Sequence, residues 1–283
     1  MKQLVFDSKT RLSIDRITMS PPNTLILIGH QGAGKFALAK YITETALLIN
    51  NIDNYAYSLI VSPTKDSITI DNIRSIERFL LLKVPSFKSI NRSIIIDQAD
   101  KLTKEAQNAL LKTLEEPPKD SLIILTVNNL NSLLSTITSR AQKLNVNLPK
   151  ERELKDFFVN QDFPKETVDQ AYLLSKGLPG TMFRILNNPD DPLILALKQA
   201  KLFLGANTYQ RSILINDFAK DKVKLQDLIE VMEIMAETSL KNNANNKIWQ
   251  NVLKSSYYLK LSLSRNSVSK LALTKFVIDL VSV

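Results

Sequence analysis

Cysteine is absent from this chain of 283 residues, and histidine occurs once, at His30. Without thiols there is no disulfide, no thiolate zinc site, no iron–sulfur cluster and no cysteine nucleophile. One histidine argues equally against histidine metal sites and Ser-His-Asp triads. The composition therefore predicts no zinc and no metal site built by the protein, and His30 fits a surface position.

Glycine, proline and long apolar runs are also scarce. Six glycines and eleven prolines leave little room for low-complexity linkers. No stretch reaches the roughly 18 apolar residues of a membrane helix. Charges occur too early for a signal peptide, so we expect a cytoplasmic protein. The net charge of +9 fits attraction to nucleic acid or simply a lysine-rich surface, because the basic residues are scattered.

The first half alternates strand-like runs with helical periods. Residues 24–29, 93–97 and 122–127 are short, nearly continuous apolar runs, typical of parallel strands buried on both faces. Between the last two, residues 104–116 place apolar side chains on one helical face, and Pro117 and Pro118 stop the helix. This order predicts an α/β layer with helices covering a parallel sheet.

The second half has helical periodicity almost throughout. A further interruption, NNPDDP, occurs at 187–192. We therefore predict three domains: an α/β core at 1–148, a small helical unit at 149–190, and a C-terminal helical domain at 191–283.

The stretch GHQGAGKFALAK follows the first strand and opens a helix, as a phosphate-binding loop does. Gly29, Gly34 and Lys35 match the pattern Gly-x-x-x-x-Gly-Lys, and Gly32 lies inside it. Backbone N–H groups and the helix N-terminus would form an anion site, which Lys35 would complete. The next residue should be Ser or Thr to bind magnesium, but it is Phe36. The pattern predicts P-loop ancestry and leaves ATP binding open.

Two further strand ends carry polar residues. Asp97 is placed as a Walker B carboxylate, but Gln98 follows it where working ATPases have a water-polarising Glu. Asp97 also fits a turn-capping role. Asn128 or Asn129 fits a sensor of the γ-phosphate, although asparagines also form turns.

Arg140 lies in TITSRAQ, near the end of a short helical stretch. A cation there suits the helix dipole. On this pattern alone, a local structural role remains open.

Together these motifs resemble the delta-prime subunits of the bacterial DNA polymerase III clamp loader. The most specific match is IIIDQADKLTKEAQNALLKTLEEPP, and SITIDNIRSIERFL resembles the preceding helix. TITSRAQ resembles the family's Ser-Arg-Cys motif, with Ala141 in the cysteine position, and GLPGTMFRIL resembles a glycine-rich turn of its lid. The resemblance covers about 22–186; beyond it, only helical character and length agree.

The resemblance implies an AAA+ architecture: a P-loop core, a helical lid and a C-terminal collar through which subunits form an open ring. The ring loads a sliding clamp onto primed DNA. The implied partners are the gamma/tau ATPase and delta subunits, the clamp, and DNA through the complex, with no membrane. Delta-prime is usually non-hydrolysing and offers its Ser-Arg-Cys arginine to a neighbour's ATP; the matching residue is Arg140.

Departures from working ATPases accumulate in this chain. The family's cysteine-ligated zinc module is absent, and the lid's sensor arginine is replaced by Gly180. Arg184 follows one turn later, and whether it substitutes is open. With Phe36 and Gln98, three parts are missing, which predicts no useful hydrolysis and no required cofactor. The alternatives are an active gamma-type ATPase and an ATP-dependent replication initiator or helicase loader.

Overall fold

A computed structural model describes residues 4–85, 89–265 and 268–281. The chain divides into two compact units, one of 1–161 with 178–181 and the other of 162–177 with 182–283. The predicted domain limits at 148 and 190 stay predictions. No helix in the described ranges is long and apolar enough to cross a membrane.

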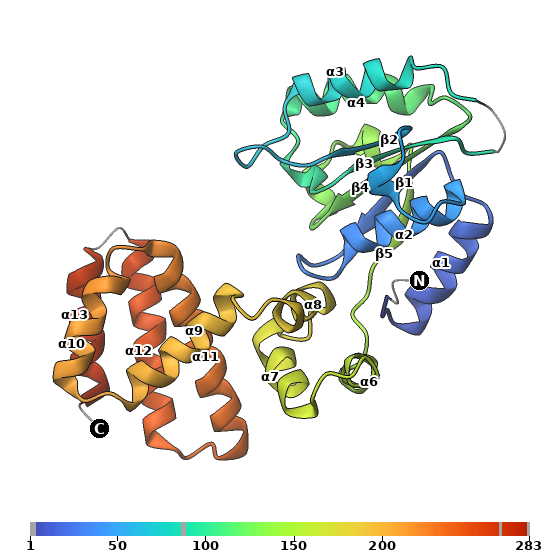
Figure 1. The fold of residues 1–283 in the computed structure, drawn as a ribbon. Coiled ribbons are helices and arrows are strands. Elements are labelled where there is room, and N and C mark those ends of the chain that lie inside the picture. Colours follow the sequence, from blue (N-terminus) through green and yellow to red (C-terminus); the bar gives the residue numbers. More distant parts are fainter. Residues whose placement is uncertain (1–3, 86–88, 266–267, 282–283) are drawn as a thin grey trace. The chain divides into compact units, whose positions relative to one another are not determined.

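The first unit is a parallel sheet between two helical layers (Figure 1). Its strands are β1 (Thr24–Ile28), β2 (Ser58–Val61), β3 (Arg92–Ile96), β4 (Ser121–Val127) and β5 (Gln142–Asn145). Its helices are α1 (Ser8–Met19), α2 (Lys35–Leu47), α3 (Ile70–Leu80), α4 (Lys104–Glu115), α5 (Ser135–Thr138) and α6 (Glu151–Val159). Three 3-10 turns are η1 (Ile52–Asn54), η2 (Ala99–Lys101) and η3 (Leu130–Ser132).

All five strands are parallel, in the order β2-β3-β4-β1-β5. The three predicted strands are confirmed as β1, β3 and β4, buried along almost their whole length. The edge strand β2 was not predicted. Its first three residues are only half-buried, so it lacks the continuous apolar run of a central strand.

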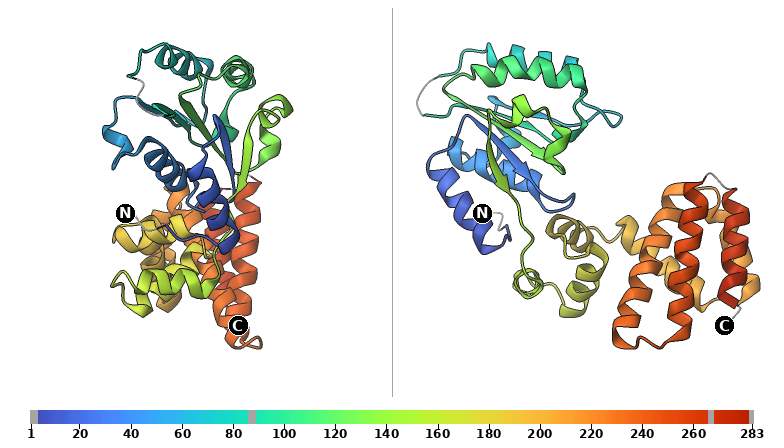
Figure 2. Two further views of the ribbon diagram at one scale, coloured as in Figure 1. Left: turned by 90° about the vertical axis from the view of Figure 1, so that its right-hand side faces the viewer. Right: turned by 180° about the vertical axis from the view of Figure 1, so that it is seen from behind.

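Side chains of successive strand residues point to opposite faces of the sheet, so the core of this unit forms two clusters, one on each face. Ile26, Ile94 and Ile123 face the cluster under α3 and α4, whereas Leu25 and Ile95 face the cluster under α1 and α2. The right-hand view of Figure 2, from behind, shows the sheet between these two helical layers.

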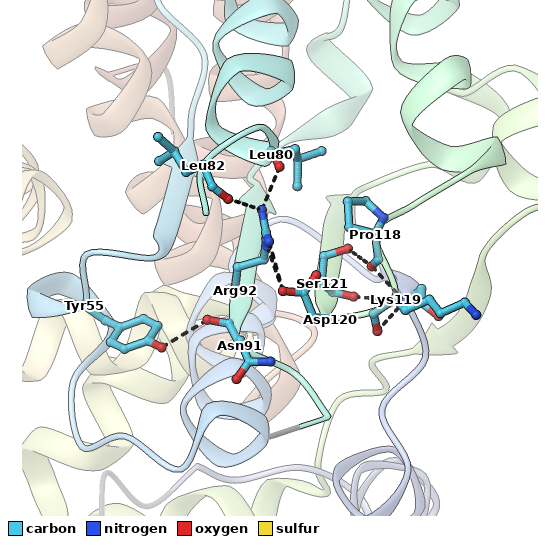
Figure 3. A network of polar contacts seen from close by, with 10 residues as sticks. Tyr55, Leu80, Leu82, Asn91, Arg92, Pro118, Lys119, Asp120 and Ser121 are labelled. Carbon is cyan, nitrogen blue, oxygen red and sulfur yellow. Dashed lines mark hydrogen bonds and ion pairs between the residues drawn. The ribbon is translucent and has the colours of Figure 1, made fainter. Parts of the chain in front are cut away.

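A polar network at the amino end of β3 anchors the chain after α3 (Figure 3). Arg92 donates through Nη1 to the carbonyls of Leu80 and Leu82, at 2.7 and 3.1 Å. Its Nε and Nη2 donate to Asp120 at 3.2 and 3.0 Å, and Tyr55 donates to the Asn91 carbonyl at 3.0 Å. Arg92 is buried, so its ion pair with Asp120 stabilises the fold. The pair lies at the amino ends of the strands, away from the P-loop at their carboxyl ends.

The second unit is all-helical, as predicted. Its helices are α7 (Lys165–Ser175), most of α8 (Pro179–Asn187), α9 (Pro192–Gly205), α10 (Thr208–Phe218), α11 (Lys222–Asn242), α12 (Lys247–Ser264) and α13 (Ser269–Val281). Helices α9 to α13 form a bundle (Figure 1). At its centre the ring of Phe203 stacks on Phe276 and meets Phe218 edge-on, with centroids 6.0 and 6.3 Å apart. Helix α1 was not predicted, and α10 and α13 lie in the half predicted to be helical without having been singled out as separate helices.

Candidate functional site

The glycine-rich loop connects β1 to α2 at the point where the strand order reverses. The chain leaves β1 toward β2 on one side, and reaches β5 on the other side after β4. In open α/β sheets, ligands bind in the crevice beyond the carboxyl ends of strands at such a point. The loop is fixed there because Gly29 donates to the Val127 carbonyl at 3.2 Å.

The loop glycines are required by conformation and space. Gly32 and Gly34 have φ of 82° and 88°, the left-handed region that favours glycine. A Cβ at Gly29 would lie 2.9 Å from the Val146 carbonyl oxygen. The backbone therefore has the form that the sequence pattern predicts.

Lys35, the predicted phosphate ligand, is buried and bonded within the protein. Its Nζ donates to the carbonyls of Gly29 and His30, both at 2.8 Å, and to Asn128 Oδ1 at 2.9 Å. An ammonium group has three N–H donors, so these contacts use all of them. Burial lowers the pKa of Lys35, and the carboxylates of Asp100 and Asp97 oppose that shift.

Asn128 extends this network to the next strand. Its backbone N–H and Nδ2 donate to the two carboxylate oxygens of Asp100, at 3.2 and 3.1 Å. Asp100, Asn128 and Lys35 thus form a polar chain across the carboxyl ends of β3, β4 and β1. The structure brings together three predicted residues, Gly29, Lys35 and Asn128. Sequence reasoning missed Asp100, whose signal was the Ala-Asp pair after β3.

Asp97 has other hydrogen-bond partners. Its Oδ1 accepts from the Thr126 hydroxyl at 2.6 Å, and its Oδ2 accepts from Gln98 Nε2 at 3.4 Å. Thr126 also accepts from the Gln98 backbone N–H at 2.9 Å. Asp97 therefore ties the end of β3 to β4, and its side-chain bonds differ from the turn cap considered from the sequence.

Phe36 follows Lys35, at the position where a P-loop carries the Ser or Thr whose hydroxyl binds magnesium. Its ring lies against the core cluster under α1 and α2, and the Lys40 ammonium lies 5.0 Å from its centroid. An aromatic ring supplies none of the oxygen ligands that magnesium requires. The side chain therefore contributes packing and a cation–π contact.

The start of α8 closes on the P-loop backbone. Gly180 donates its N–H to the Gly32 carbonyl at 2.8 Å, and a Cβ on Gly180 would lie 2.8 Å from that oxygen. Only glycine fits this approach without displacement. Arg184 forms an ion pair with the buried Asp191 at 3.0 Å, within the helical unit.

We expect Gly180→Ala to lower the free energy of unfolding by about 1–3 kcal/mol, because the added methyl overpacks the contact with the loop. Gly205→Ala is the matched control, since nothing lies within 4 Å of its Cβ position in α9. Urea titrations followed by circular dichroism measure both. Equal urea midpoints for Gly180→Ala and Gly205→Ala would contradict the close contact between Gly180 and the Gly32 carbonyl.

Arg140 lies at the surface just beyond α5. Its Nη2 lies 2.9 Å from Glu115 Oε1, at the end of α4, and its Nη1 donates to the Thr136 carbonyl at 3.0 Å. About a third of its side chain is exposed, 36%. Both contacts are with α4 and α5, so Arg140 is not part of the polar chain around Lys35.

The five-stranded parallel sheet, the P-loop after β1 and the start of α8 that contacts this loop define the fold class of AAA+ P-loop domains. A crystal structure of a DNA polymerase III gamma subunit-related protein from Thermotoga maritima has the same fold. It superposes with a TM-score of 0.61 over 95% of this chain and 98% of that one, at 22% sequence identity.

Within that class the chain resembles delta-prime subunits of DNA polymerase III. The family profile described as DNA polymerase III, delta subunit matches residues 17–150, just under half of the chain. The delta-prime subunit of Haemophilus influenzae is 37% identical over 84 residues, 30% of this chain and 25% of the relative. That of Buchnera aphidicola is 26% identical over 232 residues, 76% of this chain. The chain spans 65% of the length of the Buchnera protein.

Proposed function

We propose that this protein is a delta-prime-like subunit of a DNA polymerase III clamp loader in the cytoplasm. In this role it joins gamma/tau ATPase and delta subunits and helps to place the sliding clamp on primed DNA. It hydrolyses no ATP itself and supplies Arg140 in trans to the ATP of a neighbouring subunit. The similarity to delta-prime subunits supports membership of this complex. The geometry of the P-loop supports the proposal that ATP is hydrolysed by a neighbouring subunit and not by this one.

The observation that carries this proposal is the bonding of Lys35. Its three donors reach two loop carbonyls and Asn128, so a phosphate would have to displace existing charge-assisted bonds. Phe36 and Gln98 further remove the metal hydroxyl and the water-polarising carboxylate. The P-loop then acts as a structural joint between β1, α2 and the start of α8, and binds neither nucleotide nor metal tightly.

Arg140 has the opposite character, because its guanidinium is accessible. An arginine stays charged at any physiological pH and can contact two phosphate oxygens at once. Its own subunit holds no competent hydrolytic site in this proposal, so the phosphate must belong to another subunit. There the guanidinium neutralises charge that builds up during phosphoryl transfer.

We assign assembly to the collar, 191–283. Its helices expose large apolar side chains, which are typical of protein interfaces. Examples are Leu202, Tyr209, Ile213, Ile248 and Leu271. By contrast, α11 buries most of its apolar side chains in its own bundle. The interface is therefore better sought on α9, α10, α12 and α13.

We expect the purified chain alone to show no ATP turnover above background. When it is mixed with gamma-type and delta subunits from the same cell, it should enter one stable complex in size-exclusion chromatography. Magnesium-dependent turnover by the isolated chain would favour the gamma-type ATPase. Strong, salt-sensitive DNA binding by the isolated chain, with no complex formed, would favour the alternative of an ATP-dependent replication initiator or helicase loader.

A further inference from the structure

Glu115 is the last residue of α4 and the ion-pair partner of Arg140. We propose that Glu115 is a positioning residue, which holds the Arg140 guanidinium ready for the neighbour's phosphate. This inference rests on the proposed function of Arg140. It adds a second residue to that site, from a helix that the sequence alone does not join to it.

The geometry leaves the guanidinium able to act while it is held. Glu115 and the Thr136 carbonyl each accept one hydrogen bond, one from Nη2 and one from Nη1. A guanidinium carries five N–H donors in one plane. Within the contacts of the described chain, Nε–H and one N–H on each terminal nitrogen remain for phosphate oxygens. The ion pair can therefore persist when Arg140 contacts a phosphate, and the side chain enters that contact with fewer rotamers to lose.

Helix α4, which carries Glu115, is fixed to the segment that leads into α5, just before Arg140. Gln107 on α4 is buried, and its Nε2 donates to the Ser132 carbonyl at 3.1 Å. Its Oε1 accepts from the Leu134 N–H, the residue just before α5, at 2.8 Å. The Glu115 and Arg140 backbones thus belong to elements joined by a buried amide, the kind of frame that holds a site precisely.

The position of Glu115 is poor for its own helix. A carboxylate at the last residue of α4 lies at the negative end of the helix dipole, where cations are favoured. The charge of Arg140 offsets this disadvantage, whereas nothing in helix formation requires a glutamate there. Because Glu115 is unfavourable for the end of its own helix and contacts Arg140, we attribute the glutamate at this position to its contact with Arg140.

The test uses a reconstituted complex with Glu115→Gln in this subunit. We expect single-turnover hydrolysis of the ATP that Arg140 serves to slow about two- to fivefold, as for loss of an exposed ion pair, with the affinity of that site for ATP unchanged. The difference should shrink at high salt, which screens the pair. Glu115→Asp should recover part of the rate, and the neighbouring Glu116→Gln is the matched control. The unfolding midpoint of the isolated chain should not fall in Glu115→Gln.

A double-mutant cycle with Arg140→Ala decides between explanations. If Glu115 acts through Arg140, Glu115→Gln has no further effect once Arg140 is alanine. A full additional loss in that background would overturn the positioning role. A wild-type rate for Glu115→Gln beside a reduced rate for Arg140→Ala would reject only the positioning role. A wild-type rate for Arg140→Ala in an intact complex would reject the proposed function and the inference with it.

Discussion

Arg140→Ala should abolish efficient hydrolysis at the neighbouring subunit's ATP while leaving this subunit folded. A phosphoryl-transfer arginine is worth about 10³–10⁵ in rate, and we expect the chemical step at that one site to slow by at least about 10³. The folded chain loses only an exposed ion pair and one carbonyl contact, a cost of about 0.2–1 kcal/mol. Single-turnover hydrolysis by the reconstituted complex measures the effect.

The other ATPase sites of the complex should continue to turn over, so clamp loading is the second readout and should fall with the lost site. Arg140→Lys should rescue little, because an ammonium lacks the planar donors of a guanidinium. Arg152→Ala is a suitable control: it removes another surface arginine, paired with Asp156 at 3.6 Å. A wild-type rate with intact assembly would show that Arg140 serves only α5 and Glu115.

Lys35→Ala should destabilise the isolated chain, although in a working P-loop the same change would chiefly weaken nucleotide binding. It removes the Nζ donor from the carbonyls of Gly29 and His30 and from Asn128 Oδ1, and of these the His30 carbonyl keeps a bond from the Ala33 N–H. Hydrogen bonds to a charged group are worth about 1.5–3 kcal/mol, and we expect a loss of that size in the free energy of unfolding. Urea unfolding of the nucleotide-free chain measures it.

Two variants separate the causes. Lys35→Met keeps the apolar stem and removes the donors, so it should lose nearly as much as alanine does. Lys101→Met removes a surface partner of Asp66, a pair that is worth only about 0.2–1 kcal/mol. An unchanged unfolding midpoint for Lys35→Ala, together with loss of measurable ATP binding, would contradict the structural role of Lys35.

The pH dependence has a definite sign. The pKa of Lys35 is lowered in the folded chain because the group is buried, so the unfolded chain binds that proton more tightly. Stability relative to Lys35→Met should therefore increase as the pH rises from the lowered pKa toward the ordinary lysine value of about 10.4. The same urea titrations at several alkaline pH values measure this difference.

Much of the fold was predictable because its signals are local. The runs that became β1, β3 and β4 are apolar at consecutive positions, since these strands are buried on both faces. Pro117 ends α4 near the predicted residue. By contrast, α10 buries only Ile215 and Phe218, so its sequence carries little of the amphipathic period by which a helix such as α4 was recognised.

The sequence by itself determined the loop backbone, because glycine's freedom at positive φ is a property of single residues, as at Gly32 and Gly34. It also shows Phe36 and Gln98 directly, at the positions where working P-loop ATPases carry Ser or Thr and Glu. The tertiary structure decided how the remaining polar groups are used. Lys35 meets an asparagine 93 positions away, and Arg140 meets a glutamate 25 positions away. Residues so far apart along the chain share no periodic pattern that would reveal their contact. Strand order brings Lys35 and Asn128 together, and helix packing brings Arg140 and Glu115 together.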